Sequence, residues 1–248
     1  MDLSIGELSY AVCVLLLASI VRGLTGFGFS AIIVTGLGLV VAPAQTVMLA
    51  LFLEVIASVR MLPSTWKNIN YKLLVTLCIG TAVGTPVGVK LLVFLSPDSI
   101  RLIISCAVLI FAVLIWRGFK YTGKRNVGVD CFVGFVSGVC NGAAALGGLP
   151  VVTFLLSTEA AVVATRATLI AVFFCTDVYA LLVAGGHGII TSQTLVNVVC
   201  SVPLLLIGVA IGQKLFSVAS AAVFKKVAVF LLIGLSCVGL IKSVITFL

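Results

Sequence analysis

This chain of 248 residues has very few charged side chains. It holds seven Asp and Glu and 15 Lys and Arg, so charged residues make up 9% of the sequence. A soluble globular domain is about 25% charged, so the composition excludes that class. Hydrophobic residues make up 62% of the chain, and its mean hydropathy is +1.38. Their runs are continuous, which also excludes the weakly alternating strands of an outer-membrane barrel.

The long apolar runs predict an all-α, polytopic integral membrane protein. A transmembrane helix needs about 20 mostly apolar residues, so the chain has room for about eight to ten membrane segments and for no extramembrane domain. The stretch Met1–Leu8 lacks the basic region of a cleavable signal peptide, so we expect the first segment to stay in the protein. We expect a multi-pass protein of the bacterial inner, or plasma, membrane.

Motifs for catalysis, metals and nucleic acids are also missing. The chain has a single histidine, His187, in a glycine turn, and eight cysteines without a C-x-x-C pair. Its acids are scattered, and neither G-x-S-x-G nor H-E-x-x-H occurs. The net charge of +8 comes from basic residues in loop-sized gaps, not from a patch with interleaved aromatics. We therefore expect no enzyme, no cofactor, no metal and no nucleic-acid partner; the expected partners are a small anion and membrane lipid.

The first half of the chain predicts four helical stretches beyond an initial, interrupted one. A first segment over 8–21 should stop at Arg22–Ser30, because three glycines in six residues break a helix. Ser96-Pro97-Asp98 forms a turn that also caps the helix after it. The later segments are expected over 31–41, 46–62, 72–95 and 99–116.

The second half repeats this plan, and the repeat is the most informative feature of the sequence. The motif Gly84-Thr-Pro-Val-Gly-Val-Lys-Leu recurs 124 residues later as Gly208-Val-Ala-Ile-Gly-Gln-Lys-Leu. At a slightly shorter offset, Gly26–Phe29 aligns with Ala145–Gly148, and Arg22 falls near Asn141. We therefore divide the chain into an N-terminal repeat, 1–122, and a C-terminal repeat, 123–248, which together form one membrane domain.

Basic residues help to decide whether the repeats are parallel or inverted, because they favour the cytoplasmic side. If the first segment crosses once, the repeats are parallel; if it doubles back, they are inverted. The parallel arrangement places eight basic residues on one side of the membrane and five on the other. The inverted one leaves only Lys90, Arg101 and Lys242 opposite Arg60, Lys67, Lys72, Arg117, Lys120, Lys124, Arg125, Lys214, Lys225 and Lys226. We favour inverted repeats with both termini outside.

Glycine-broken segments at matching places in two halves predict a transporter binding site. A broken helix leaves backbone N–H groups and a positive dipole end facing a cavity, which suits a small anion. The alternative is close helix packing by small residues. The substrate-binding candidates are Arg22, Thr25, Gly26, Gly28, Asn141, Gly142, Gly147, Gly148, Arg166 and Thr168, with Ser30 and Thr165 as further neutral donors.

Two arginines and two acids lie against or within apolar sequence, where a charge costs several kcal/mol and needs a purpose. The guanidinium groups of Arg22 and Arg166 match an oxyanion, although Arg166 is alternatively an interfacial anchor. Glu54 and Asp177 fall one helical turn apart when the halves are aligned, and they are the candidates for proton coupling. Alternatively, they form structural ion pairs with Arg22, Arg60 or Arg166.

Taken together, these motifs resemble the TauE/SafE family of sulfite-exporter-type permeases. The resemblance covers nearly the whole chain and rests on Gly23–Phe29, Gly142–Pro150 and the Ala-Thr-rich stretch Ala164–Thr168. The first break reads Gly-Phe-Gly-Phe-Ser, and Ala143–Ala145 stands where the family often has glycine. The resemblance implies a secondary active transporter of sulfite, organosulfonates or related organic anions, with export coupled to protons.

Three other interpretations stay open at this point: an importer, a channel-like anion pore, and a membrane scaffold or assembly subunit that transports nothing. A homodimer is compatible with the sequence.

Overall fold

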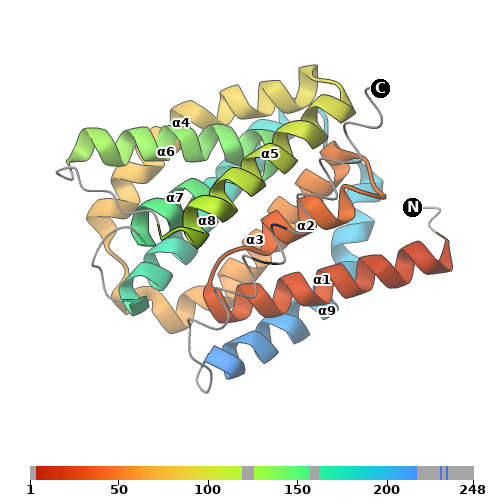
Figure 1. The fold of residues 1–248 in the computed structure, drawn as a ribbon, viewed down its shortest axis with the longest axis horizontal. Coiled ribbons are helices and arrows are strands. Elements are labelled where there is room, and N and C mark those ends of the chain that lie inside the picture. Colours follow the sequence, from red (N-terminus) through yellow and green to blue (C-terminus); the bar gives the residue numbers. More distant parts are fainter. Residues whose placement is uncertain (1–3, 119–125, 157–161, 217–229, 231–232, 234–248) are drawn as a thin grey trace.

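The computed structural model describes residues 4–118, 126–156 and 162–216, together with 230 and 233. Within these ranges the regular structure is entirely helical (Figure 1). The α-helices are α1 (Ile5–Thr25), α2 (Phe29–Leu37), α3 (Pro43–Thr65), α4 (Tyr71–Phe94), α5 (Pro97–Trp116), α6 (Val127–Ala144), α7 (Gly148–Leu156), α8 (Val162–Gly185) and α9 (Ser192–Phe216). A short 3₁₀ turn, Trp66–Asn68, follows α3.

Seven of these helices are long and apolar enough to cross a membrane, judged by length and composition. The predicted all-helical membrane fold is thus confirmed, and seven of the expected eight to ten segments lie in the described part of the chain. The helices α2 and α7 have nine residues each, which is too short to cross about 30 Å of hydrocarbon. Of the basic residues used for orientation, Lys120, Lys124, Arg125, Lys225, Lys226 and Lys242 lie outside the described residues.

The first helix runs further than its sequence predicts. It starts with a capping box between Ser4 and Glu7 and continues past Val21 to Thr25, so the predicted end at Val21 is wrong. Gly23 lies inside the helix and packs closely on α9, where a Cβ atom would collide with the backbone of Val209. The break itself is confined to the next three residues, where Gly26 and Gly28 have φ angles of +81° and +86°.

Each short helix follows a break and turns back toward the helix before it. Tyr10 on α1 donates a hydrogen bond of 3.2 Å to the carbonyl of Gly36 near the end of α2. A Cβ atom at Gly36 would also press on the side chain of Val14. The chain therefore doubles back between α1 and α2. At the second break, Ser137 on α6 donates a 2.7 Å hydrogen bond to the carbonyl of Gly147, which precedes α7.

Two pairs of long helices meet backbone to backbone through glycine. On α4, Gly80, Gly84 and Gly88 face the backbone of Cys131, Phe135 and Val139 on α6. In return, Gly134, Gly138 and Gly142 face Leu77, Thr81 and Thr85. Contact positions rise together along both sequences, so α4 and α6 are parallel, with the four-residue spacing typical of close membrane-helix packing.

The second pair consists of α1 and α9. Gly208 and Gly212 on α9 face the backbone around Leu16 and Ile20 on α1, so these two helices are also parallel. The α4–α6 pair lies along one edge of the molecule and the α1–α9 pair along the opposite edge, with α3 and α8 packed together between them (Figure 1).

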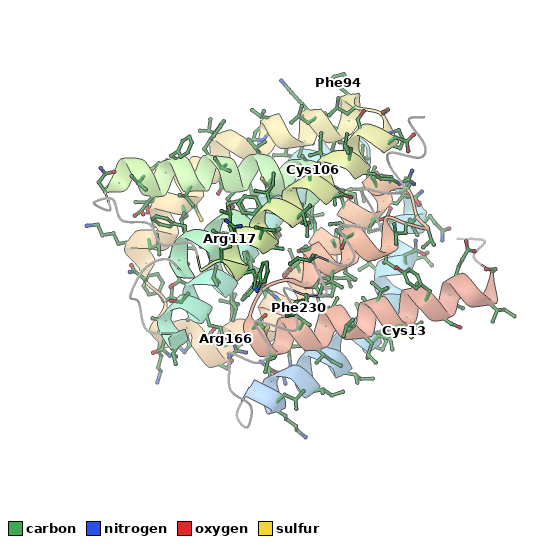
Figure 2. All side chains as sticks on the ribbon, viewed as in Figure 1. Cys13, Phe94, Cys106, Arg117, Arg166 and Phe230 are labelled. Carbon is green, nitrogen blue, oxygen red and sulfur yellow. The ribbon has the colours of Figure 1, made fainter. Side chains whose placement is uncertain are left out.

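The outward faces of the long helices are apolar, as a lipid-facing surface requires. Val75, Ile79 and Val83 repeat every four residues on one face of α4 and are all more than half exposed. Phe94, at the end of the same helix, is 81% exposed and projects from the outer edge (Figure 2). The buried charged side chains Arg22, Glu54 and Asp177 lie beside the two helix breaks instead.

Candidate functional site

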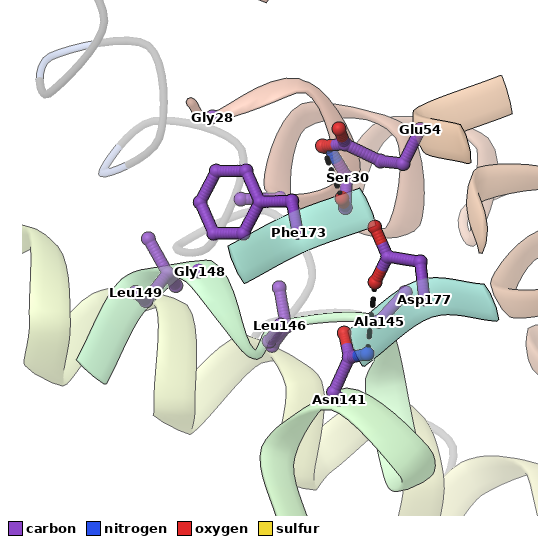
Figure 3. A pocket seen from close by; sticks show the side chains of 11 residues that line it. Gly28, Ser30, Glu54, Asn141, Ala145, Leu146, Gly148, Leu149, Phe173 and Asp177 are labelled. Atoms are coloured by element: carbon purple, nitrogen blue, oxygen red, sulfur yellow. Dashed lines mark hydrogen bonds between the residues drawn. The ribbon is translucent and has the colours of Figure 1, made fainter. Parts of the chain in front are cut away.

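The two breaks meet at a small cavity between α2, α3, α6, α7 and α8 (Figure 3). It offers a water-sized molecule about 20 Å³, which is room for about one water. The lining residues are Gly28, Ser30, Ala31, Glu54, Asn141, Ala145, Leu146, Gly148, Leu149, Phe173 and Asp177. Helices from both halves of the chain thus contribute to one site.

Positive φ angles shape both breaks. Gly26 and Gly28 adopt this conformation at the first break, and Ala145, with φ of +55°, adopts it at the second. Ala145 is the only described residue other than glycine with a positive φ, a conformation that costs an L-residue roughly 1–2 kcal/mol. The breaks end α1 and α6 at the cavity, and residues of the first turns of α2 and α7, such as Ser30 and Gly148, line it.

Arg22, in the last turn of α1, is fully buried and has partners on α3, on α8 and in the first break. Its Nη2 lies 2.9 Å from Oε2 of Glu54 and donates a 2.8 Å hydrogen bond to the hydroxyl of Ser58 on α3. Its Nη1 donates to the carbonyl of Gly26, and the guanidinium lies 4.7 Å from the ring centre of Phe173 on α8. The structure therefore realises the ion pair of Arg22 with Glu54 that the sequence left as an alternative.

The second oxygen of Glu54 binds the beginning of α2. Its Oε1 accepts a 2.7 Å hydrogen bond from the hydroxyl of Ser30 and a 3.3 Å hydrogen bond from the Ser30 backbone N–H. The carboxylate thus bridges Arg22 and the positive N-terminal end of a helix, two groups that both favour an anion.

Asn141 holds the corresponding position at the second break. Its Nδ2 donates a 2.8 Å hydrogen bond to Oδ1 of Asp177 on α8 (Figure 3). Its Oδ1 accepts a 3.3 Å hydrogen bond from the N–H of Gly147. A neutral amide thus binds the carboxylate at this break, whereas at the first break a guanidinium does so.

Arg166 lies at the edge of this cluster. Its Nη2 donates a 2.7 Å hydrogen bond to the carbonyl of Gly23, and its side chain packs against Gly26, beside the end of α1 (Figure 2). It does not line the cavity, although it lies next to the same break as Arg22.

Three other predicted residues serve the surrounding structure. The hydroxyl of Thr25 donates to the carbonyl of Val21 and accepts the N–H of Phe27, which fastens the break. Thr168 accepts the N–H of Asn70 at 3.0 Å, so it ties α8 to the loop after α3. Gly142 packs against the backbone of α4.

The structure brings together the following predicted residues around the two breaks: Arg22, Gly26, Gly28, Glu54, Asn141, Gly147, Gly148 and Asp177.

The sequence did not predict the lining residues Ala31, Ala145, Leu146 and Leu149 as site residues. Nor did it predict two residues that contact Arg22. Ser58 follows Glu54 by one helical turn, and Phe173 precedes Asp177 by one turn, so helical spacing from the two acids could have found both. No group of three or more His, Cys, Asp or Glu in the described residues could hold a metal ion.

Long apolar helices and two helix breaks that meet at a small cavity lined by two carboxylates define a polytopic membrane protein of the transporter class. The chain belongs to the sulfite exporter TauE/SafE family, which it matches over residues 11–239. It is 28% identical over 222 residues to the probable sulfite/organosulfonate exporter TauE of Cupriavidus necator, with 85% of each chain covered. No solved structure matches the chain. Family membership places it among transporters, not enzymes.

Proposed function

We propose that this protein is a secondary active transporter that exports small oxyanions, such as sulfite, organosulfonates or related organic anions, across the cytoplasmic membrane. The observation that carries the proposal is Arg22, a fully buried guanidinium at the point where the two breaks meet. The relative from Cupriavidus necator, a probable sulfite/organosulfonate exporter, supports the same substrate class and direction.

The walls of the cavity favour a small oxyanion. The first turn of α2 supplies backbone and hydroxyl donors at Ser30, and Arg22, directly behind the lining residue Glu54, supplies charge-assisted donors; these groups suit sulfonate and sulfite oxygens. Leu146, Leu149 and Phe173 supply the large apolar side chains of the lining. Because the cavity holds about one water, substrate binding requires its walls to move, as alternating access demands.

Two carboxylates in the same cavity support coupling to protons. Glu54 and Asp177 both line it, and Arg22 forms an ion pair with Glu54. An entering anion meets the negative charge of these carboxylates, and a proton on one of them removes that repulsion. Protonation of a carboxylate therefore favours binding of the anion, which links the proton gradient to anion transport.

Two inverted repeats, 1–122 and 123–248, provide the rocking units of this carrier. The described helices support this division: a long, a short and two long helices open each half. In this division α1 corresponds to α6, and α4 corresponds to α9. Each of the parallel pairs α4–α6 and α1–α9 therefore joins the first helix of one half to the fourth helix of the other. The hydrogen bonds from Arg22 to Ser58 and from Asn141 to Asp177 both span 36 residues. An offset of about 119 residues thus aligns the two halves of the site.

Transport into proteoliposomes tests the proposal. Purified protein should give saturable uptake of radiolabelled sulfite or methanesulfonate, and acid outside the vesicles should accelerate it. The variant Asp177→Asn should retain exchange of internal for external anion but lose most of the acceleration by the pH gradient, because one titrating group is gone. Acetate serves as the carboxylate comparison, and protein-free vesicles give the background.

Each alternative has its own outcome in this experiment. Flux without saturation would indicate a channel-like pore, and uptake that runs in only the inward direction would indicate an importer. No flux above background for any anion would reject transport and favour the scaffold interpretation. A full response of Asp177→Asn and Glu54→Gln to the pH gradient would reject proton coupling through these residues.

A further inference from the structure

We propose that the carboxylate of Glu54 is a tethered counter-anion that occupies the oxyanion site, and that substrate binds by replacing it on Arg22 and α2. This inference rests on the proposed function, because it assigns the substrate's place within the same cavity. It also narrows the substrate to a class: anions whose charged group carries three oxygens.

The two oxygens of Glu54 already use the donors that an oxyanion needs. Oε2 lies 2.9 Å from Nη2 of Arg22, while Oε1 accepts the hydroxyl and the N–H of Ser30 at 2.7 and 3.3 Å. A guanidinium, a hydroxyl and the N-terminus of a nine-residue helix thus converge on one carboxylate. The same set binds sulfonate or sulfite oxygens without any new donor.

The Arg22–Glu54 pair leaves one polar atom on each partner without a hydrogen bond: Nε of Arg22, and Oε2 of Glu54, which contacts Arg22 only as an ion pair. Arg22 is completely buried, yet its Nε has no hydrogen-bond partner. A buried donor without a partner costs roughly 1–3 kcal/mol, so the site favours an occupant that brings more acceptors. A sulfonate or sulfite group carries one oxygen more than a carboxylate. The geometry thus favours three-oxygen anions over carboxylic acids.

The second break has no comparable tethered anion. At the offset of about 119 residues that aligns the two halves of the site, Glu54 corresponds to Phe173, whose ring stacks on Arg22. Asp177 lies one turn further along α8, and its hydrogen bond comes from Asn141. Of the two carboxylates in the cavity, only that of Glu54 binds both Arg22 and the N-terminus of a helix. Asp177 is therefore a matched control, since its carboxylate lies in the same cavity without these two contacts.

Equilibrium binding of methanesulfonate to the purified full-length protein tests the inference, because a sulfonate keeps its charge over the working pH range. Glu54→Gln retains the shape of the side chain but removes the competing charge. It should bind methanesulfonate about 10- to 100-fold more tightly than the wild type, the equivalent of one charge-assisted hydrogen bond. Asp177→Asn should show a clearly smaller gain. In Glu54→Gln the preference for methanesulfonate over acetate should persist.

The outcomes separate this inference from the proposed function. If the wild type binds methanesulfonate and Glu54→Gln binds it equally or more weakly, Glu54 is not a competitor, and the carrier proposal stands without this step. If neither the wild type nor either variant binds any anion, the proposed function falls as well. Should Glu54→Gln fail to fold, Glu54→Asp replaces it. Its shorter carboxylate cannot span both donors, so tighter binding supports the inference and weaker binding overturns it.

Discussion

At the scale of single residues, the pair of Arg22 and Glu54 decides both the stability of the site and its chemistry. Both side chains are almost completely buried, with 0% and 4% exposure. Moving two charges out of water costs about as much as their attraction returns, so the intact pair adds little net stability. Removal of one partner is different, because the other charge is then buried without compensation.

We therefore expect Arg22→Gln to destabilise the protein by about 3–5 kcal/mol, while Arg22→Gln/Glu54→Gln loses clearly less. Thermal unfolding in detergent measures both. Arg101→Gln is the control, because the Arg101–Asp98 pair is partly exposed and its loss should cost about 1 kcal/mol or less. Equal losses in the single and double variants would show that Arg22 stabilises the fold without its ionic partner.

At the scale of helices, glycine brings the parallel pairs into backbone contact. The residues Gly80, Gly84 and Gly88 on α4 and their counterparts on α6 leave no room for a Cβ atom. Without a hydrophobic drive between helices in lipid, such close packing supplies much of the attraction. Since α6 ends at the second break, its packing on α4 also positions Asn141.

Gly84→Ala should thus weaken the α4–α6 pair by about 1–3 kcal/mol, the usual cost of inserting a methyl group into a packed interface. A Cβ atom at this position would overlap the backbone of Phe135. Gly6→Ala, also within a helix but with open space around it, should instead stabilise by about 0.5–1 kcal/mol. Detergent thermal unfolding of the two variants compares them directly, and equal effects would mean that α4 and α6 are not in backbone contact.

At the scale of the whole molecule, helix directions determine which loops share a side of the membrane. The helix α1 is parallel to α9, α4 is parallel to α6, and α2 and α7 turn back. These directions are compatible with one path of the chain back and forth across the membrane. The loop around Trp66–Asn68 and the connection before Val127 then lie on one side. The turns at Ser96 and at His187 lie on the other. Excess basic residues in the first group favour the cytoplasm for that side.

Fusions that truncate the chain test this topology. Alkaline phosphatase, which is active only after export, should be active when fused after His187 and inactive when fused after Asn126. A fluorescent protein that folds only in the cytoplasm should give the reverse pattern at the same two positions. The same reporter being active at both positions would contradict the arrangement of α6 to α8. Reversal of both results would leave the fold intact but invert its orientation.

Much of this fold follows from local sequence. Apolar runs of membrane-spanning length predict the long helices, because each needs only about 20 residues of suitable composition. Gly26 and Gly28 predict the first break, since positive φ angles are local properties of glycine. Arg22, Glu54 and Asp177 stand out as site residues because a charge within an apolar run needs a partner or a function.

Partner choice and exact helix ends depended on tertiary structure. Whether Arg22 would meet Glu54, or Gly23 would break α1 or pack on α9, is decided by how distant helices dock. The same holds for Thr168, a candidate for substrate that binds the N–H of Asn70. Local sequence sets which groups are available, but packing between helices far apart in the chain determines which of them come within hydrogen-bonding distance.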